Sequence, residues 1–121
     1  MRDSGIEEFA EHLIKCVRDR AIESYDGILI KNMKSPTTRK YVELFGDQLE
    51  SAVVNIVPDV VDTTIFYLLK AIENQELAII YKTQDGEVVD LDERGLAEMA
   101  GNYITDDAEG WRQKFSHSRI F

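Results

Sequence analysis

The residues of this sequence best suited to chemistry are acidic. Carboxylate oxygens are the ligands that Ca²⁺ and Mg²⁺ prefer, and four carboxylates follow one another closely: Asp85, Glu87, Asp90 and Asp92. An EF-hand loop, however, requires ligands at alternate positions, a central glycine and a terminal glutamate, and the stretch GEVVDLDERG does not satisfy that spacing. The sequence therefore predicts neither a metal nor another cofactor, and a carboxylate-based, metal-dependent hydrolase stays as a third alternative.

Two histidines and one cysteine are the other candidates for catalysis. His12 lies on the flank of a predicted helix and His117 lies in the tail SHSRIF, and neither is near a nucleophile motif such as G-x-S-x-G. Cys16 falls at the border of an apolar face, where cysteine acts as a small hydrophobic residue, although Arg20 one turn later could favour its thiolate. The sequence contains no glycine-rich phosphate loop. We therefore predict that the protein is not an enzyme.

Acidic residues are concentrated in one stretch of the chain, which is the predicted binding surface. The net charge is −9, and between positions 85 and 109 nine acidic residues accompany a single basic one, Arg94. A surface of this sign repels nucleic acid and attracts a basic protein, although its plainer interpretation is a solvated face that keeps the protein soluble. The residues predicted to contact a partner are carboxylates and one aromatic: Asp85, Glu87, Asp90, Asp92, Glu93, Asp106, Asp107 and Trp111.

A basic stretch elsewhere in the chain suggests a molecule with two poles. Between positions 27 and 42 the sequence has no acidic residue and four basic ones: Lys31, Lys34, Arg39 and Lys40. If folding keeps the two stretches apart, we expect an acidic pole and a basic pole. If folding brings them together, the basic residues would neutralise the predicted binding surface.

The spacing of apolar residues predicts a long amphipathic helix at the start of the chain. An S-x-x-E capping box at residues 4–7 predicts its first turn, and it should run to about Tyr25, with Gly27 as its terminator. Arg18 and Asp19 fall on its polar face. The apolar face consists of Ile6, Phe9, Ala10, Leu13, Val17 and Ala21. The residues that follow, 28–34, are expected to form a short strand or a loop.

Two shorter helices are predicted next. Ser35 places a capping residue before a proline at the first helical position, which predicts a helix over 36–45. Asp47 and Glu50 form another capping pair, followed by apolar residues at helical spacing. Pro58 should interrupt this helix because it lacks a backbone N–H donor.

The stretch 58–74 is predicted to be the central helix. Its hydrophobic residues cover most of its circumference, and such a helix is normally packed by neighbours on several sides. Asp62 stands one turn inside it. An acid at that place complements the helix dipole, and the alternative interpretation is a polar anchor at the mouth of the core.

A β-hairpin and a helical tail follow. Asp85-Gly86 lies between two β-prone runs and predicts a type I′ turn, hence one antiparallel hairpin over 76–91 with one face on the helices. A short helix over 96–103 is then predicted after an acidic cap, ended near residue 101. A last helical turn places Trp111 and Phe115 four residues apart, where they either lock the tail onto the core or form an interface.

Length and composition point to one domain. The 121 residues, 44% hydrophobic and 31% charged, suit a single globular domain over 1–121. The predicted fold class is α+β and predominantly helical: a helical bundle around the central apolar helix (58–74) with one antiparallel β-hairpin (76–91). A single cysteine, no signal-peptide pattern and no apolar run near the ~20 residues that span a bilayer predict a cytoplasmic protein outside the membrane.

Two stretches of the sequence resemble a known class of proteins. VPDVVDTTIFYLLKAIEN and GWRQKFSHSR resemble segments of bacterial immunity proteins, which are encoded beside polymorphic or contact-dependent growth inhibition toxins. Immunity proteins share neither a common fold nor a general motif, so the resemblance implies no fold and carries over no functional residue. It implies a cytosolic protein that binds its cognate toxin domain and blocks the active site or substrate access.

The charge and the resemblance agree on one point. The partners of immunity proteins are toxins, many of which are nucleases with basic grooves. An acidic inhibitor can occupy a groove that binds a polyanion. The leading hypothesis is therefore a non-enzymatic protein that neutralises a toxin. The alternative is a small helical adaptor or a self-associating regulatory protein that associates through Trp111 and Phe115.

Overall fold

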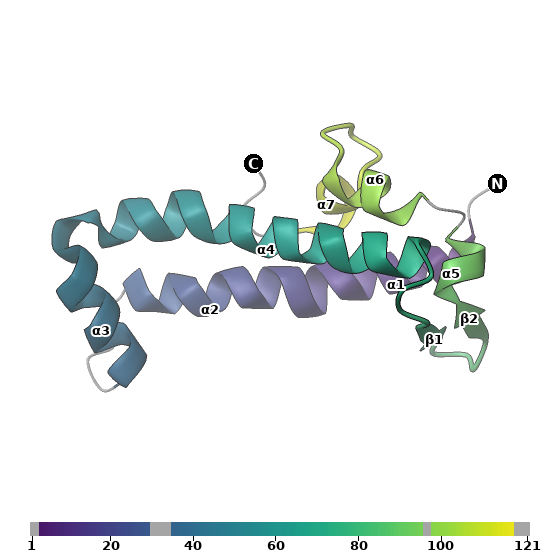
Figure 1. Cartoon of the computed structure of the whole chain (residues 1–121), viewed down its shortest axis with the longest axis horizontal. Helices are drawn as coiled ribbons and strands as arrows, with labels where there is room; N and C mark the ends of the chain where they lie inside the picture. The colour runs from purple at the N-terminus through teal and green to yellow at the C-terminus, as the bar shows by residue number, and fades with distance from the viewer. Residues whose placement is uncertain (1–2, 30–34, 96–97, 118–121) are drawn as a thin grey trace.

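Two long antiparallel helical segments form the length of the molecule (Figure 1). The computed structural model describes residues 3–29, 35–95 and 98–117. In the first segment, three helical stretches follow one another without interruption: α1 (Ser4–His12), η1 (Leu13–Arg18) and α2 (Asp19–Leu29). The second segment is α4 (Leu49–Glu73), and at one end of the molecule it is preceded by α3 (Pro36–Phe45) and the 3-10 turn η2 (Gly46–Gln48).

A hairpin and three short helices lie around the other end of these segments. The strands β1 (Ile80–Lys82) and β2 (Val88–Asp90) pair antiparallel, with Tyr81 opposite Val89. They are followed by α5 (Leu91–Arg94), α6 (Met99–Ile104) and α7 (Trp111–Phe115). The predicted fold class is confirmed: the chain is mainly helical, with a long central helix and one antiparallel hairpin.

A π-helical turn, η1, changes which residues of the first helix are buried. Such a turn holds one residue more than an α-helical turn, so it displaces every later side chain by about 100°. Val17, predicted on the buried face, is 51% exposed, whereas Arg18 beside it is fully buried. Ile22 takes the place of Ala21 in the same way. The buried face therefore follows Ala10, Ile14, Arg18 and Ile22.

Both ends of this first segment differ in detail from the sequence prediction. The N-cap is Asp3 rather than Ser4, because Oδ1 of Asp3 accepts hydrogen bonds from the backbone N–H groups of Gly5 (2.9 Å) and Ile6 (3.2 Å). At the other end, α2 continues through Gly27 to Leu29. The remainder of the predicted strand or loop, 30–34, lies outside the described residues.

The α3 helix has the predicted boundaries. Ser35 caps it by accepting from the backbone N–H of Thr38, Pro36 stands in its first turn, and Gly46, with a φ of 50°, ends it. The predicted capping pair of Asp47 and Glu50 is not formed, because η2 leads directly into α4.

The α4 helix continues through Pro58, where the sequence pattern predicts a break. Proline removes one backbone hydrogen bond from a helix, and the complete burial of the Pro58 ring offsets part of that cost. As a result, residues 36–73 form one stretch that is long and apolar enough to cross a membrane by length and composition alone. The expectation that no such stretch exists is wrong by that criterion, although core helices of soluble proteins meet it too.

The hairpin turn lies where it is predicted, with a different geometry. The backbone N–H of Thr83 donates to the carbonyl of Glu87 (2.9 Å), and that of Gly86 donates to the carbonyl of Thr83 (3.0 Å). Among the described residues of this turn Gly86 alone has a positive φ, 95°, whereas a type I′ turn needs two. Val89 is fully buried, so one face of the hairpin packs on the helices as expected.

The helices after the hairpin are shorter than predicted. The predicted helix over 96–103 corresponds to α6, which begins at Met99 and continues through Gly101 to Ile104, and a separate short helix, α5, begins at Leu91 directly after β2. Residues 96–97 lie outside the described part of the chain. The last helix, α7, begins at Trp111 after Gly110.

The main core lies at the hairpin end of the molecule. Its buried residues come from α1, η1, the second half of α4, β2, α5, α6 and α7: Ala10, Leu13, Ile14, Ile65, Leu69, Ile72, Val89, Leu91, Met99, Ala100, Tyr103 and Trp111. A second, smaller cluster has Leu49 and Val53 as its buried residues. We call residues 19–29 and 36–61 the arm, and the other described residues the head.

Candidate functional site

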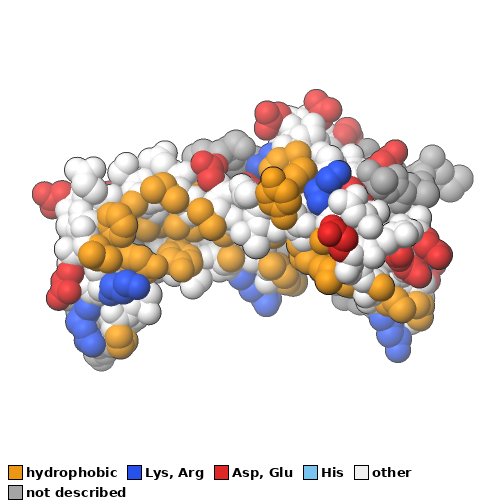
Figure 2. Space-filling model, viewed as in Figure 1, with side chains coloured by type: hydrophobic (Ala, Val, Ile, Leu, Met, Phe, Trp, Pro, Cys, Tyr) orange, Lys and Arg blue, Asp and Glu red, His pale blue; other side chains and the backbone are white. Residues whose placement is uncertain are grey.

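Five of the predicted partner-binding carboxylates lie along the hairpin and the start of α5, on the head. Asp85 and Glu87 belong to the hairpin turn, and Asp90, Asp92 and Glu93 lie where β2 ends and α5 begins. Asp85 accepts hydrogen bonds from the Thr83 hydroxyl and from the backbone N–H of Glu87, and the Thr83 bond is the main cause of its lowered pKa. Acidic side chains are visible over this end of the molecule (Figure 2).

Arg94 balances part of this group. Its Nε and Nη2 donate to the carboxylate of Asp3 at 2.8 and 2.7 Å, and its Nη1 lies 3.2 Å from Oε2 of Glu87. The hydrogen bond from Arg94 is the main reason why the pKa of Asp3 is lowered. Glu87 therefore already has a cationic partner within the chain.

Asp90 has a carboxylate for a neighbour instead. The hydrogen bond between the side chains of Asp90 and Asp92 raises the pKa of Asp90, and burial and the charges of Asp92 and Glu93 add to this effect. In the part of the chain that the structure describes, these three carboxylates form no ion pair. Their mutual repulsion is therefore the least compensated electrostatic feature of the group.

The other predicted contact residues lie apart from this group. Asp106 and Asp107 are exposed on the loop between α6 and α7, where Asp106 lies 3.8 Å from Nη2 of Arg112. Trp111 is 3% exposed, so the prediction that it contacts a partner is wrong. Because α7 folds onto α1, the Trp111 ring meets Phe9 edge to face at 6.2 Å, and the aromatics lock the tail onto the core.

The described residues of the predicted basic stretch lie at the far end of the arm. Arg39 and Lys40 belong to α3, which is at the opposite end of the long axis from the hairpin (Figure 1). Lys40 places its ammonium 5.7 Å from the centre of the Tyr41 ring. Lys31 and Lys34 fall outside the described residues. Arg39 and Lys40 thus do not neutralise the acidic group on the head.

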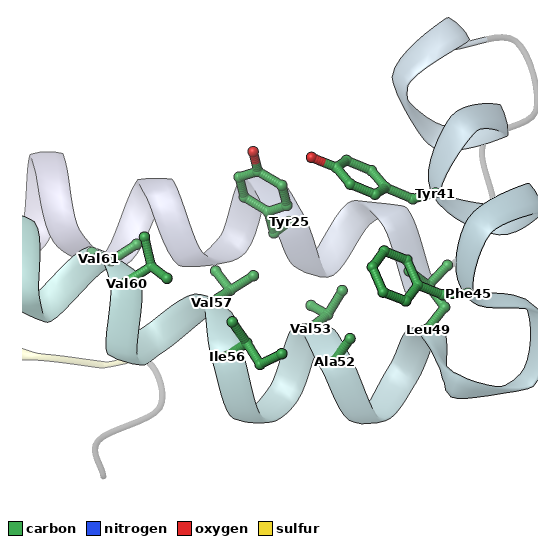
Figure 3. A pocket seen from close by; sticks show the side chains of 10 residues that line it. All are labelled: Tyr25, Tyr41, Phe45, Leu49, Ala52, Val53, Ile56, Val57, Val60 and Val61. Atoms are coloured by element: carbon green, nitrogen blue, oxygen red, sulfur yellow. The ribbon is translucent and has the colours of Figure 1, made fainter.

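An apolar groove runs along the arm between α2, α3 and the first half of α4 (Figure 3). It encloses a hollow of about 260 Å³, and all its lining residues are uncharged: Tyr25, Tyr41, Phe45, Leu49, Ala52, Val53, Ile56, Val57, Val60 and Val61. Phe45, Ile56 and Val60 are 40%, 57% and 58% exposed. Figure 2 shows a broad patch of hydrophobic side chains on this part of the surface.

Two tyrosines close one side of the groove. The rings of Tyr25 and Tyr41 meet edge to face at 6.3 Å, and the Tyr41 hydroxyl points toward Tyr25 (Figure 3). The charge of Tyr41 and a hydrogen bond with it raise the pKa of Tyr25. A signal for the groove exists in the sequence, since apolar residues recur at helical spacing on both sides of Pro58, but the predicted break at that residue hides it.

A buried charge network joins the two long helical segments to the tail. Nε of Arg18 donates to Oδ1 of Asp62 at 2.8 Å, and Nη1 of Arg112 donates to Oδ2 of Asp62 at 2.8 Å. The Tyr103 hydroxyl also donates to Oδ1, at 2.7 Å, and its burial, together with this bond, raises the pKa of Tyr103. Asp19 accepts from Nη1 of Arg18 at 3.0 Å. Two carboxylates thus balance two guanidinium groups.

The same network holds the C-terminal residues. The Ser116 hydroxyl donates to Oδ1 of Asp19 at 2.7 Å, and the backbone N–H of His117 donates to Oδ2 at 2.9 Å. Arg112 donates further to the backbone carbonyls of Tyr103 (2.9 Å) and Ile104 (2.8 Å). These bonds satisfy the charged groups within the protein, which suits a structural role rather than ligand binding.

Asp62 therefore has a different role from the one its position suggests in the sequence. Because α4 begins at Leu49, Asp62 lies in the middle of the helix, and the helix-dipole interpretation is wrong. Arg18 and Arg112, its partners, are not among the predicted functional residues. A signal for Arg18 was present: it stands four residues after Ile14 and four before Ile22, a lone cation in a row of apolar residues.

His12 takes part in a second polar cluster, on the head. The Tyr81 hydroxyl donates to Oε2 of Glu8 at 2.6 Å and accepts from Nδ1 of His12 at 2.7 Å. Burial and the bond to Glu8 raise the pKa of Tyr81 to about 12, so it is a weak acid that stays protonated at neutral pH. A polar hollow of about 480 Å³ adjoins this cluster. The contacts bind the hairpin to α1.

Neither metal ligation nor a reactive thiol gains support from the geometry. Among residues 3–29, 35–95 and 98–117, no three His, Cys, Asp or Glu side chains come together in a way that could hold a metal ion. Cys16 is exposed, on η1. His117 contacts the carboxylates of Asp19 and Glu23 at 3.3 and 3.1 Å.

Comparisons with known proteins find no relative of this chain. The chain matches no protein-family model, no curated protein and no solved structure. Its function is therefore inferred from its own surfaces, of which the acidic group on the head and the apolar groove of the arm are the two most distinctive.

Proposed function

We propose that this chain is a non-enzymatic, cytoplasmic protein-binding domain whose acidic head docks a protein with a basic surface. The observation that carries the proposal is the group formed by Asp90, Asp92 and Glu93 where β2 meets α5; the hydrogen bond with Asp92, and then the charges of Asp92 and Glu93, raise the pKa of Asp90. A cation placed among these carboxylates relieves their repulsion. Lysine and arginine side chains of a partner protein are a natural source of that cation.

The sequence resemblance makes the proposed partner more specific. Segments 57–74 and 110–119 resemble immunity proteins, and this supports a toxin domain as the partner, a nuclease with a basic groove in particular. An acidic head can occupy such a groove and exclude its polyanionic substrate. The concentration of negative charge also accelerates the encounter at low ionic strength.

Charge reversal tests this proposal. The triple variant Asp90→Lys, Asp92→Lys and Glu93→Lys should weaken binding to a candidate toxin domain from a neighbouring gene by at least ~10-fold at low salt, because close charge pairs across an interface contribute above ~1.5 kcal/mol each. Binding should also depend less on salt. Isothermal titration calorimetry at two salt concentrations gives both quantities, and growth of cells that express the toxin domain gives the biological readout.

A second triple variant controls for net charge. Glu43→Lys, Asp47→Lys and Glu50→Lys change the charge by the same amount at exposed positions of the arm. This variant should bind as the wild type does and should still protect the cells. If both triple variants bind equally well, or if the head variant protects the cells fully, the acidic head is not the docking surface.

A further inference from the structure

We propose that the apolar groove of the arm is a homodimer interface, occupied by the arm of a second copy of this chain in antiparallel orientation. The arm has two helices side by side, α2 and the first half of α4, with α3 at their end (Figure 1). Two such pairs laid face to face form a four-helix bundle, an arrangement that buries the apolar side of every helix.

The arm has only a small hydrophobic core for its length. Its small cluster has two buried residues, whereas the side chains around the groove stay open to water, with Ile56 57% and Val60 58% exposed. At 100° per residue, Tyr67 continues the same face of α4, and it is 65% exposed. A contiguous apolar face of this extent on a small domain marks an interaction surface.

The chemistry of the groove selects a second copy as its occupant. Every lining residue is uncharged, so the occupant must present an apolar surface, and the arm of a second copy presents one. The groove also combines a hollow with exposed side chains, Phe45 and Ile56 among them. In a two-fold symmetric dimer, the exposed side chains of each copy can fill the hollow of the other.

Charge then selects the antiparallel orientation. The stretch 85–109 carries most of the net charge of −9 and lies on the head, so antiparallel arms place the two acidic heads at opposite ends of the dimer. Lys40, on α3, places its ammonium over the ring of Tyr41 in the groove, and the exposed Asp59 directly precedes the lining residue Val60 on α4. Antiparallel arms therefore bring Lys40 of one copy toward Asp59 of the other.

Sedimentation equilibrium tests the interface. The wild type should have the mass of two 13.9-kDa chains, and Ile56→Glu with Val60→Glu should raise the dimer dissociation constant by at least ~100-fold, because the symmetry places each new carboxylate in the interface twice. Val88→Glu is the matched control, since Val88 is 59% exposed but lies on the hairpin. It should leave the dimer intact.

A charge exchange tests the orientation. Lys40→Glu alone and Asp59→Lys alone should each weaken the dimer by about 3-fold to 10-fold, and the two changes together should restore it. Because both residues are exposed, the variants should fold, which circular dichroism verifies. Equal weakening by the double variant would overturn the antiparallel arrangement.

Two results would overturn the dimer itself. One is a wild type that sediments as a 13.9-kDa monomer at ~100 μM, well above the dissociation constant of a stable dimer. The other is a monomer that floats with vesicles of phosphatidylcholine and phosphatidylglycerol, which would assign the groove to lipid. Neither result affects the proposed role of the head, because head and arm use opposite ends of the molecule.

Discussion

At the scale of single residues, Asp62 is the position on which most of the structure depends. Its carboxylate accepts from Arg18, Arg112 and Tyr103, and it is the group that balances both guanidinium ions. The Asp62→Ala substitution would leave two buried cations without their main partner. We expect it to lower the free energy of unfolding by about 3–5 kcal/mol, or to prevent folding.

Urea denaturation measures this effect with a built-in reporter. Trp111, the single tryptophan, is buried in the core, so its fluorescence follows unfolding. Glu50→Ala removes an exposed carboxylate from the same helix and should change the free energy of unfolding by less than about 0.5 kcal/mol. Similar effects of the two substitutions would show that the network contributes little.

Asp90 gives a prediction about pH. Because its pKa is raised above 3.8 in the folded protein, its contribution to stability is complete below pH 3.8 and is lost as the pH rises through the folded-state pKa. In an NMR titration, the midpoint for Asp90 should lie above 3.8. In the Asp92→Asn variant it should fall, because the amide can donate to the carboxylate, whereas Glu50→Gln should leave it unchanged.

An opposite result for Asp90 would be equally informative. A midpoint that stays the same in the Asp92→Asn variant would mean that the two side chains do not share a proton. The group would then lack the repulsion on which the proposed docking of a cationic partner depends. This titration therefore tests the electrostatic basis of the proposed function without any partner protein.

At the scale of secondary-structure elements, most of the architecture could be predicted from the sequence. Apolar spacing, the Ser35-Pro36 start and the Asp85-Gly86 turn locate α1, α3, the central helix and the hairpin. These signals are local, acting over a few residues. The candidate site was predicted less well, because the groove and the buried network arise from residues that are distant in sequence.

Two local departures explain the larger errors. The π turn at η1 shifts the buried face by one residue, and a helical-wheel pattern with a fixed period cannot show this shift. Pro58 was expected to end a helix, yet the surrounding packing keeps it inside α4. In both cases tertiary contacts outweighed a local preference, and Arg18 and the groove residues were misjudged as a result.

The π turn leads to a prediction about deletions. Removing Cys16, an exposed residue within η1, should convert the turn to a regular α-helix and leave Ala10, Ile14 and Arg18 on one face. We expect the free energy of unfolding to change by about 1 kcal/mol or less. Circular dichroism and urea denaturation would check this.

Removing Ser24 is the matched control. It is an exposed residue in the regular helix α2. If the π turn is kept, deleting Ser24 rotates Tyr25 out of the groove. If the π turn is lost instead, the deletion rotates Arg18 and Ile22 out of the core. We expect a loss of more than about 3 kcal/mol. If deleting Cys16 is as damaging as deleting Ser24, η1 does not contain a surplus residue.

At the scale of the whole molecule, the head and the arm should differ in local stability. The head contains the main core, whereas the arm depends on a small cluster and an uncovered groove. In dilute solution, amides of residues 49–57 should exchange with deuterium at least ~100-fold faster than those of residues 65–73. Mass spectrometry with hydrogen exchange measures both segments in one experiment.

Raising the protein concentration extends this experiment. If the arm pairs with a second copy, exchange in residues 49–57 should slow as the concentration passes the dissociation constant, because association stabilises the folded arm by mass action. Exchange in residues 65–73 should change far less. Uniform protection of both segments in dilute solution would contradict the division of the molecule into a well-packed head and a marginal arm.

The contact between α1 and α7 has a consequence for folding kinetics. Nζ of Lys114 reaches Glu7 across 107 positions of the chain, and Ser116 reaches Arg18 across 98. Joining such distant segments costs loop-closure entropy before any contact is made, whereas the helices of the arm are linked by a short connection. We expect α7 to dock last, so in stopped-flow refolding the fluorescence of Trp111 should lag behind the formation of helix.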